Sequence, residues 1–248
     1  MSRTGSRRIP ALMRRPSGVV AGDDFDPIAD MGWERFHRGG DWTTTGSEID
    51  EWTDLSGNGN HATGATNNTN KPTAGTLGGQ DAADFTPVTQ GYFSLPSLAA
   101  ISTAGVGWVW AVMQLDADPQ PSIGSAGVWV LGSHGADDLI SNATTGDALI
   151  GPLSTTRPNT GDPTTDRAVP HTISVLSAAS DFEVWVNNTS HYSSGTNTVG
   201  VAASPELGKS VSRYFNGLIA ELGILDREPS AAEMAAMQAY AVARYGIT

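Results

Sequence analysis

The longest strand that the sequence predicts reads VGWVWAVMQL, from Val106 to Leu115. Successive side chains of a strand point to opposite faces, and here both sets are apolar. Trp108 and Trp110 fall on one face, and Val109 and Met113 fall on the other. Because a strand that is apolar on both faces is covered on both, we expect this one in the middle of a sheet, with a packed layer on each side.

Further short apolar runs surround this strand, separated by clusters of Gly, Asn, Asp and Thr. Their length and spacing are typical of a turn-rich β protein, in agreement with 29 glycines and 14 prolines among 248 residues. Asn187 and Asn188 predict a hairpin turn, because Asn tolerates the positive φ that such turns need. The predicted strands lie at residues 33–36, 82–85, 91–95, 127–132, 171–176, 182–186, 189–193 and 214–225.

The end of the chain changes to a helical pattern. Ser230 and Glu233 have the spacing of a capping box, in which each side chain accepts a hydrogen bond from a free backbone N–H at the helix start. Gly246 is a typical stop signal. The sequence therefore predicts one amphipathic helix over residues 230–245, packed on the β-structure.

The first thirty residues have a different character. Residues 1–30 show neither a helical nor an alternating period, so we interpret them as an extended arm without a core of its own. The first twenty residues hold no acidic residue, whereas the whole chain has 26 acidic and 14 basic residues and a net charge of −12. We predict that the arm contacts an acidic partner surface through its five arginines, which are Arg3, Arg7, Arg8, Arg14 and Arg15.

Composition and charge also argue against several classes of partner. An acidic body repels nucleic acid and anionic membrane, so we expect neither as a partner. No apolar run approaches the ~20 residues that a helix needs to cross a bilayer. The sequence has no cysteine, which excludes disulfides and thiolate metal sites.

Three motifs resemble the concanavalin A-like lectin/glucanase domains of the laminin-G type. They are WTDLSGNGNHA at residues 52–62, FEVWVN at 182–187 and FNGLIAELGIL at 215–225. Residues 230–247 resemble the closing helix of bacterial and phage members, although Asn188 replaces the glycine that usually follows the second motif. The resemblance implies an all-β fold, a two-sheet antiparallel jelly-roll sandwich over residues 31–248, with one C-terminal helix and the arm at 1–30 in front of it.

The glucanase branch of this superfold works with a Glu-x-Asp-x-x-Glu pattern on one strand, which supplies the two carboxylates of a glycosidase. The nearest pattern here places Glu48 and Asp50 correctly but has Thr53 at the third position. Glu51 does not replace it, because a residue at odd spacing points to the opposite face. We therefore expect no enzymatic activity.

A loop of Asn and Gly residues supplies the candidate ligand-binding residues, which are Asp54, Asn58, Asn60 and His61. Their oxygen atoms suit a sugar or a calcium ion, although a turn held by its own Asx side chains is the commoner explanation. We expect no cofactor, with calcium as the alternative.

Three tryptophans, Trp33, Trp42 and Trp52, lie nearer to predicted loops than the others. An indole face near a loop can stack on a sugar ring. Packing at the edge of the sandwich is the simpler interpretation for each of them.

Together these features lead us to expect a non-enzymatic structural virion protein of a bacteriophage. In this hypothesis it is a head decoration protein or a tail or fibre component, anchored to capsid or tail proteins by its arm. It displays a lectin-like sandwich to glycans and forms a homo-oligomer on the particle. The alternative is a free or cell-surface carbohydrate-binding module, because this sandwich serves many functions.

Overall fold

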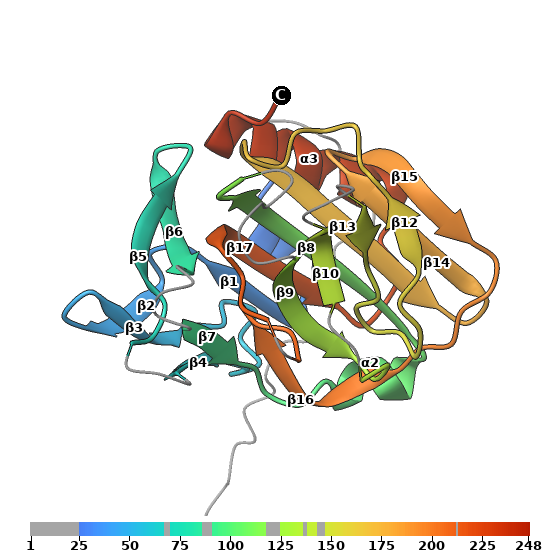
Figure 1. Ribbon diagram of the computed structural model, residues 1–248, viewed down its shortest axis with the longest axis horizontal. Coiled ribbons are helices and arrows are strands. Elements are labelled where there is room, and N and C mark those ends of the chain that lie inside the picture. Colours follow the sequence, from blue (N-terminus) through green and yellow to red (C-terminus); the bar gives the residue numbers. More distant parts are fainter. Residues whose placement is uncertain are drawn as a thin grey trace, which may run out of the picture.

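The computed structural model describes residues 25–66, 70–85, 91–117, 125–135, 138–142, 147–211 and 213–248. Within these residues, seventeen antiparallel strands and three helices form a two-layer β-sandwich (Figure 1). The predicted fold class, an all-β two-sheet sandwich with a C-terminal helix, is confirmed. In the described part of the chain, no helix has the length and apolar character needed to cross a membrane.

One layer, the helix-side sheet, is built around β17 and β8. β17 pairs with β8 along its whole length, and β13, β14 and β15 continue the sheet on the far side of β8. On the other side of β17, its first half pairs with β6 and its second half with β1. The strands of this sheet are β1 (Arg35–Arg38), β5 (Thr73–Leu77), β6 (Gln80–Phe85), β8 (Val106–Leu115), β13 (His171–Ala178), β14 (Asp181–Val186), β15 (Thr189–Ser194) and β17 (Gly217–Leu225).

The second layer, the far sheet, runs in the order β2-β3-β4-β7-β16-β9-β10-β11-β12. A single pair between Glu48 and Thr73 connects it to the other layer. Its strands are β2 (Trp42–Thr45), β3 (Glu48–Trp52), β4 (Ala62–Thr66), β7 (Gly91–Ser94), β9 (Ser125–Gly132), β10 (Asp138–Asn142), β11 (Ala148–Leu149), β12 (Asn159–Gly161) and β16 (Val201–Leu207).

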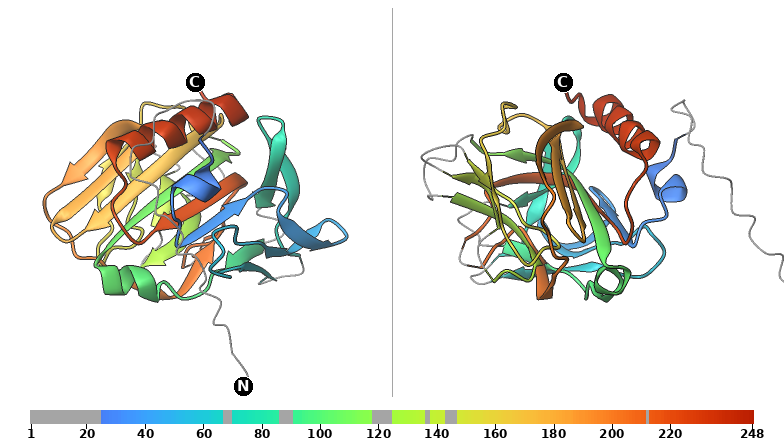
Figure 2. Two further views of the ribbon diagram at one scale, coloured as in Figure 1. Left: turned by 180° about the vertical axis from the view of Figure 1, so that it is seen from behind. Right: turned by 90° about the vertical axis from the view of Figure 1, so that its right-hand side faces the viewer.

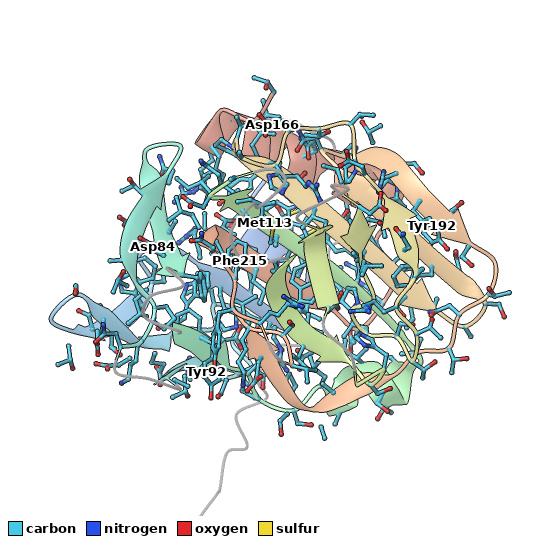
Figure 3. All side chains as sticks on the ribbon, in the orientation of Figure 1. Asp84, Tyr92, Met113, Asp166, Tyr192 and Phe215 are labelled. Atoms are coloured by element: carbon cyan, nitrogen blue, oxygen red, sulfur yellow. The ribbon has the colours of Figure 1, made fainter. Side chains whose placement is uncertain are left out.

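Two cores result, one on each face of the helix-side sheet. The main core lies between the sheets and contains Val109 and Met113 of β8, together with Phe215, and Met113 and Phe215 are labelled in the middle of Figure 3. The second core contains Trp108 and Trp110 and lies under the C-terminal helix. The alternation of β8 and its central position are thus as predicted, because β17 and β13 pair with it on both sides.

Helix α3 (Ala231–Tyr245) covers the outer face of the helix-side sheet (Figure 2). Its capping box is formed as predicted, since the Ser230 hydroxyl accepts from the Glu233 N–H and the Glu233 carboxylate accepts from the Ser230 N–H. Gly246 ends the helix with a left-handed φ of 66°. The hairpin turn between β14 and β15 is also confirmed, because Asn187 and Asn188 both have positive φ.

Two short helices were not predicted. Helix α1 (Pro27–Asp30) begins at Asp26, whose side chain accepts from the Ile28 N–H, and Ile28 packs against the second core. These residues fall in the segment that the sequence assigned to the arm. Helix α2 (Ala99–Ala104) ends at Gly105 and precedes β8.

Glu221 is a buried carboxylate beneath α3. A β-bulge between Ile219 and Glu221 changes the register of β17, and bulges redirect side chains in this way. The Glu221 Oε1 atom accepts hydrogen bonds of 2.6 Å from the hydroxyls of Tyr240 and Tyr245, and the Arg244 Nε lies 3.4 Å from the same oxygen. Burial raises the pKa of Glu221 to about 7, although both tyrosine hydrogen bonds oppose the shift.

We expect the protein to lose stability as the pH rises through neutrality. The pKa of Glu221 is higher in the folded chain, about 7, than its ordinary value of 4.5, so the folded state binds the proton more tightly. The resulting stabilisation is complete below the ordinary value and is lost as the pH rises through about 7. At about 1.4 kcal/mol per pKa unit, the loss is on the order of 3 kcal/mol, which urea unfolding at a series of pH values measures.

The substitution Glu221→Gln keeps a neutral acceptor for both tyrosines, so it is expected to flatten this pH dependence. Glu228→Gln, at an exposed position, is the matched control and should leave the dependence as it is. If Glu221→Gln and the natural chain lose stability in parallel, Glu221 is not the group responsible.

Candidate functional site

The inner face of the helix-side sheet becomes accessible at its last strands, β14 and β15. Phe182 on β14 is buried in the main core, whereas Tyr192 on β15 is half-buried and packs at the margin of that core. Tyr192 pairs in register with Val184, so its ring is on the same face as Phe182 and meets it edge-on, with 6.4 Å between ring centroids. The edge of the sandwich at β15 therefore carries an aromatic side chain that is partly exposed to solvent.

A β-bulge in β15 accompanies this aromatic residue. Val184 pairs with Tyr192 and Trp185 pairs with Ser190, which leaves His191 as the extra residue. Burial lowers the pKa of His191, and the backbone of Gly161 on β12, which lies beside the ring, opposes that shift. The bulge thus lies where the edges of the two sheets come together. Bulges are common at sheet edges and next to functional sites.

The opposite wall is a segment that leads into β12, and it begins at a strained turn. Leu153 is fully buried and has a φ of 57°, at the third position of a turn in which the Ser154 N–H donates to the Gly151 carbonyl. That position of a type II turn normally holds glycine. Such strain persists only where the surroundings determine the backbone, and here it sets the direction of residues 154–158.

Asn197 connects the two walls. Its Oδ1 accepts from the Ser154 hydroxyl at 2.7 Å, and its amide donates to the Ser177 hydroxyl and the Ala178 carbonyl, both at 2.9 Å, and to the Asp181 carbonyl at 3.3 Å. Every hydrogen-bonding atom of this amide is used. The hydrogen bonds of Asn197 therefore fix the distance between the two walls.

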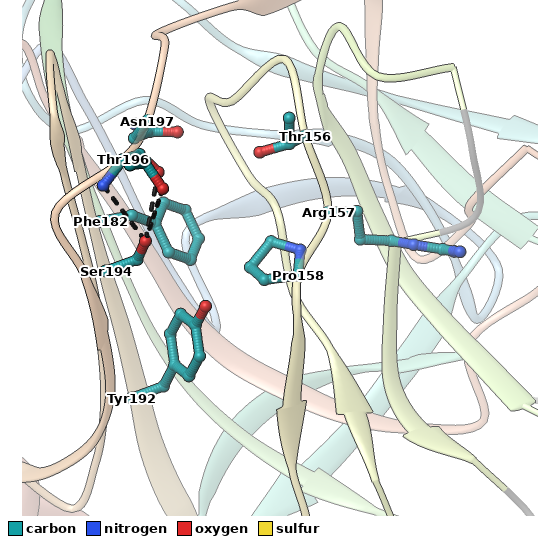
Figure 4. Close-up of a pocket in the computed structure, with 8 residues that line it drawn as sticks. All are labelled: Thr156, Arg157, Pro158, Phe182, Tyr192, Ser194, Thr196 and Asn197. Carbon is teal, nitrogen blue, oxygen red and sulfur yellow. Dashed lines mark hydrogen bonds between the residues drawn. The ribbon is translucent and has the colours of Figure 1, made fainter.

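Between these walls lies a cleft of about 200 Å³, which we call the edge cup (Figure 4). The side chains of Tyr192 and Pro158 face each other across it, while Arg157 extends away on the far side of its segment. None of the described residues that line it is acidic. The lining residues are Thr156, Arg157, Pro158, Phe182, Tyr192, Ser194, Thr196 and Asn197.

The polar groups of the edge cup are hydroxyls. Ser194 and Thr196 share a hydrogen bond of 3.1 Å between their hydroxyls, and the Thr156 hydroxyl lies 3.3 Å from that of Ser154. The Tyr192 hydroxyl has no hydrogen-bond partner among the described residues. A hydroxyl donates one hydrogen bond and accepts two, so these groups retain capacity for a ligand.

The sequence-predicted ligand loop, residues 54–61, lies elsewhere. Asp54 is buried, and its Oδ1 accepts from the N–H groups of Phe36 and Ser56, each at 2.9 Å. Its Oδ2 accepts from the Asn60 N–H and the Ser56 hydroxyl. His61 Nδ1 accepts from the Asp54 N–H at 3.0 Å. Burial alone would raise the pKa of Asp54, but the donors around it outweigh burial and lower the pKa.

The amides of this loop are also engaged within the chain. Those of Asn58 and Asn60 both donate to the Glu34 carbonyl, at 2.9 and 3.1 Å. These residues border a more open depression of about 570 Å³ that Trp33 and Asp226 also line. No group of three or more His, Asp or Glu side chains in the described ranges is arranged to hold a metal ion. Ligand or calcium binding by the loop stays a prediction.

The tryptophans near loops pack, as the simpler interpretation expected. Trp33 is 3% exposed and Trp52 is fully buried. Trp42 is partly buried and contacts Trp52 edge-on, with centroids 6.3 Å apart. Tyr192 was not among the residues that the sequence singled out, and its signal is an aromatic side chain in the polar strand TSHYSS.

Comparison with known proteins finds similarity in fold. No family model matches the sequence, and no curated protein matches it. A sialidase from Trypanosoma rangeli in complex with the inhibitor DANA has a TM-score of 0.58 and 13% identity, over 82% of this chain and 32% of the sialidase. This chain thus spans about a third of that enzyme's length.

Two further solved structures are similar. Domain 4 of a GH43 extracellular arabinanase from Geobacillus stearothermophilus, in complex with arabinotriose, has a TM-score of 0.50 and 14% identity, over 73% of this chain and 90% of that domain. A GH54 α-L-arabinofuranosidase soaked with a cyclic sulfate inhibitor has a TM-score of 0.53 and 17% identity, over 85% of this chain and 59% of the enzyme. Because the sequence identities are this low, the structural similarity shows the fold of this chain alone.

These neighbours contradict the expectation of a non-enzymatic virion protein. All three are glycoside hydrolases or a domain of one, which contradicts the prediction of no enzymatic activity as well. The error arose because a basic arm and a fold resemblance carry no information about the partner. The five arginines assigned to capsid or tail contacts, Arg3, Arg7, Arg8, Arg14 and Arg15, lie outside the described residues.

We expect Asp54→Ala to destabilise the protein by roughly 2–4 kcal/mol, because it leaves buried N–H donors without an acceptor. The pKa of Asp54 is lowered in the folded chain, so its stabilisation is present above the ordinary value of 3.8 and is lost as the pH falls below it. Urea unfolding at neutral and acidic pH measures both effects. Added calcium should leave the unfolding midpoint of the natural chain unchanged, and a midpoint that rises with calcium would show a metal site at this loop.

We expect Asn197→Ala to destabilise the edge cup by about 2–3 kcal/mol, because it removes the acceptor of the Ser154 hydroxyl and the amide donors to the Ser177 hydroxyl and the Ala178 carbonyl. Hydrogen exchange should accelerate at the amides of Thr155 and Gly200, which donate to Thr198 and Leu153 across the same walls. Asn159→Ala is the control, since its side chain makes only exposed hydrogen bonds. Equal exchange in the two variants would mean that Asn197 does not connect the walls.

Proposed function

We propose that this chain is a carbohydrate-binding domain of a carbohydrate-processing protein, and that the edge cup holds the sugar. The observation that carries the proposal is the Tyr192 ring, half-buried at the mouth of a cup whose walls are held in place and whose polar groups are hydroxyls. Sites for small ligands commonly combine an apolar aromatic surface with a few well-placed polar groups.

The chemistry of the edge cup suits a sugar. A sugar ring has an apolar C–H face that packs on an aromatic ring, and Tyr192 and Phe182 present such surfaces. The hydroxyls of a sugar both donate and accept hydrogen bonds, which matches Ser194, Thr196 and Thr156. Asn197 contributes by fixing the walls, which lowers the entropy cost of ordering them on binding.

Structural similarity supports the same proposal. The match to the arabinanase domain covers 90% of that domain, and the structure of the domain contains arabinotriose. Arabinotriose is therefore the first probe to use. The proposal concerns binding, because the pair of carboxylates that glycosidases use is not among the described residues that line the edge cup.

The substitution Tyr192→Ala is expected to weaken binding of a recognised oligosaccharide by tenfold or more, since loss of about 1.4 kcal/mol from ring packing corresponds to a factor of ten. Tyr192→Phe keeps the ring and removes the hydroxyl, so a smaller loss is expected. Isothermal titration calorimetry with arabinotriose, followed by a screen of neutral and acidic oligosaccharides, measures the affinities.

Tyr92→Ala is the matched control, because Tyr92 is a partly exposed tyrosine of the far sheet that packs against Lys209 and not in the edge cup. It should bind sugar like the natural chain. Binding that survives Tyr192→Ala but is lost in Tyr92→Ala would place the sugar elsewhere, and failure of every oligosaccharide to bind would reject the proposal.

A further inference from the structure

The edge cup is closed at both ends by contacts between its walls. At one end, the Ser154 hydroxyl donates to Asn197 at 2.7 Å and joins the segment before β12 to the chain that follows β15. At the other end, the His191 ring on β15 lies beside the backbone of Gly161 on β12. Phe182, buried in the main core, forms the floor. A ligand therefore enters through the mouth between Tyr192 and Pro158 (Figure 4).

The enclosed space limits the length of the ligand. Its volume of about 200 Å³ is smaller than the roughly 300–1,000 Å³ of pockets that hold drug-sized molecules. A cleft of this size suits a single sugar ring. A polysaccharide that passed through the cup would need an open end, whereas the two walls meet at both ends.

The charge of the site limits the kind of sugar. No described lining residue is acidic, and the one cation, Arg157, extends away from Tyr192 and Pro158 (Figure 4). The charge of Arg157 instead stabilises the buried carboxylate of Asp138, which accepts from the Gly151 N–H at 2.9 Å. A carboxylate inside the cup would meet hydroxyls and aromatic carbon in a chain of net charge −12, and burying an unpaired charge is costly.

We infer that the edge cup takes a single neutral sugar residue at the end of a glycan chain, inserted through the mouth, and that it rejects interior residues and acidic terminal sugars. This inference rests on the proposed function and adds the class of ligand to it. The rest of the glycan then extends from the mouth into solvent, past Thr156 and Ser194.

The test is a glycan array with matched pairs, probed with the full chain. Each pair holds one neutral glycan as it is and with an added terminal sialic acid or glucuronic acid. Binding is expected to fall about tenfold or more on acidic capping, because the one lining cation, Arg157, extends away from the carboxylate between Tyr192 and Pro158. Long neutral polysaccharides should bind in proportion to their number of chain ends and not to their mass.

Equal binding of capped and uncapped glycans, or binding in proportion to polysaccharide mass, would overturn this inference while leaving the proposed function in place. Binding that ignores Tyr192→Ala would overturn the proposed function itself, and the two failures are therefore distinguishable.

A second variant tests the closed end. His191→Ala removes the ring that lies beside Gly161, and His191 is partly exposed, so the fold is expected to tolerate it. The variant should admit interior sugar residues and lower the preference for chain ends, whereas Tyr192→Ala lowers binding of ends and interiors alike. An unchanged preference in His191→Ala would show that the His191 ring does not close the cup.

Discussion

Burial of both faces of the central strands is the constraint on which the rest of the structure depends. β8 and β17 present apolar side chains to both sides, so each face of their sheet needs a covering layer. The far sheet covers one face, and α3 with the segment before β1 covers the other. Since α3 lies over Glu221, a carboxylate with a pKa of about 7, we expect the packing of this outer cover to depend on pH.

The edge cup follows from where the inner cover ends. The far sheet finishes in β12, a strand of three residues, while the helix-side sheet continues to β15. The inner face of β15 is therefore covered only in part, which leaves Tyr192 between core and solvent. Strain at Leu153 and the saturated amide of Asn197 hold the opposite wall at a fixed distance, so the exposed margin is a defined cup and not a frayed edge.

A shared sandwich does not by itself assign an activity. The similar structures are carbohydrate-processing enzymes or a domain of one, and this chain matches only part of the larger ones. The residues of the edge cup give the reason to favour sugar binding here, because hydroxyls, an aromatic ring and a lack of acidic groups fit neutral sugars. The loop at residues 54–61 has a different role in the fold, since its Asp54 fastens the chain to β1 through Phe36.

The sequence alone determined the architecture, because strand alternation, turn chemistry and helix capping are local properties. The two apolar faces of Val106–Leu115, the turn at Asn187 and the capping box at Ser230 were all readable in this way. Only the tertiary structure decided the site. The cup joins Tyr192 to a wall more than thirty residues earlier in the chain, and its position depends on where one sheet stops short of the other, which no local pattern encodes.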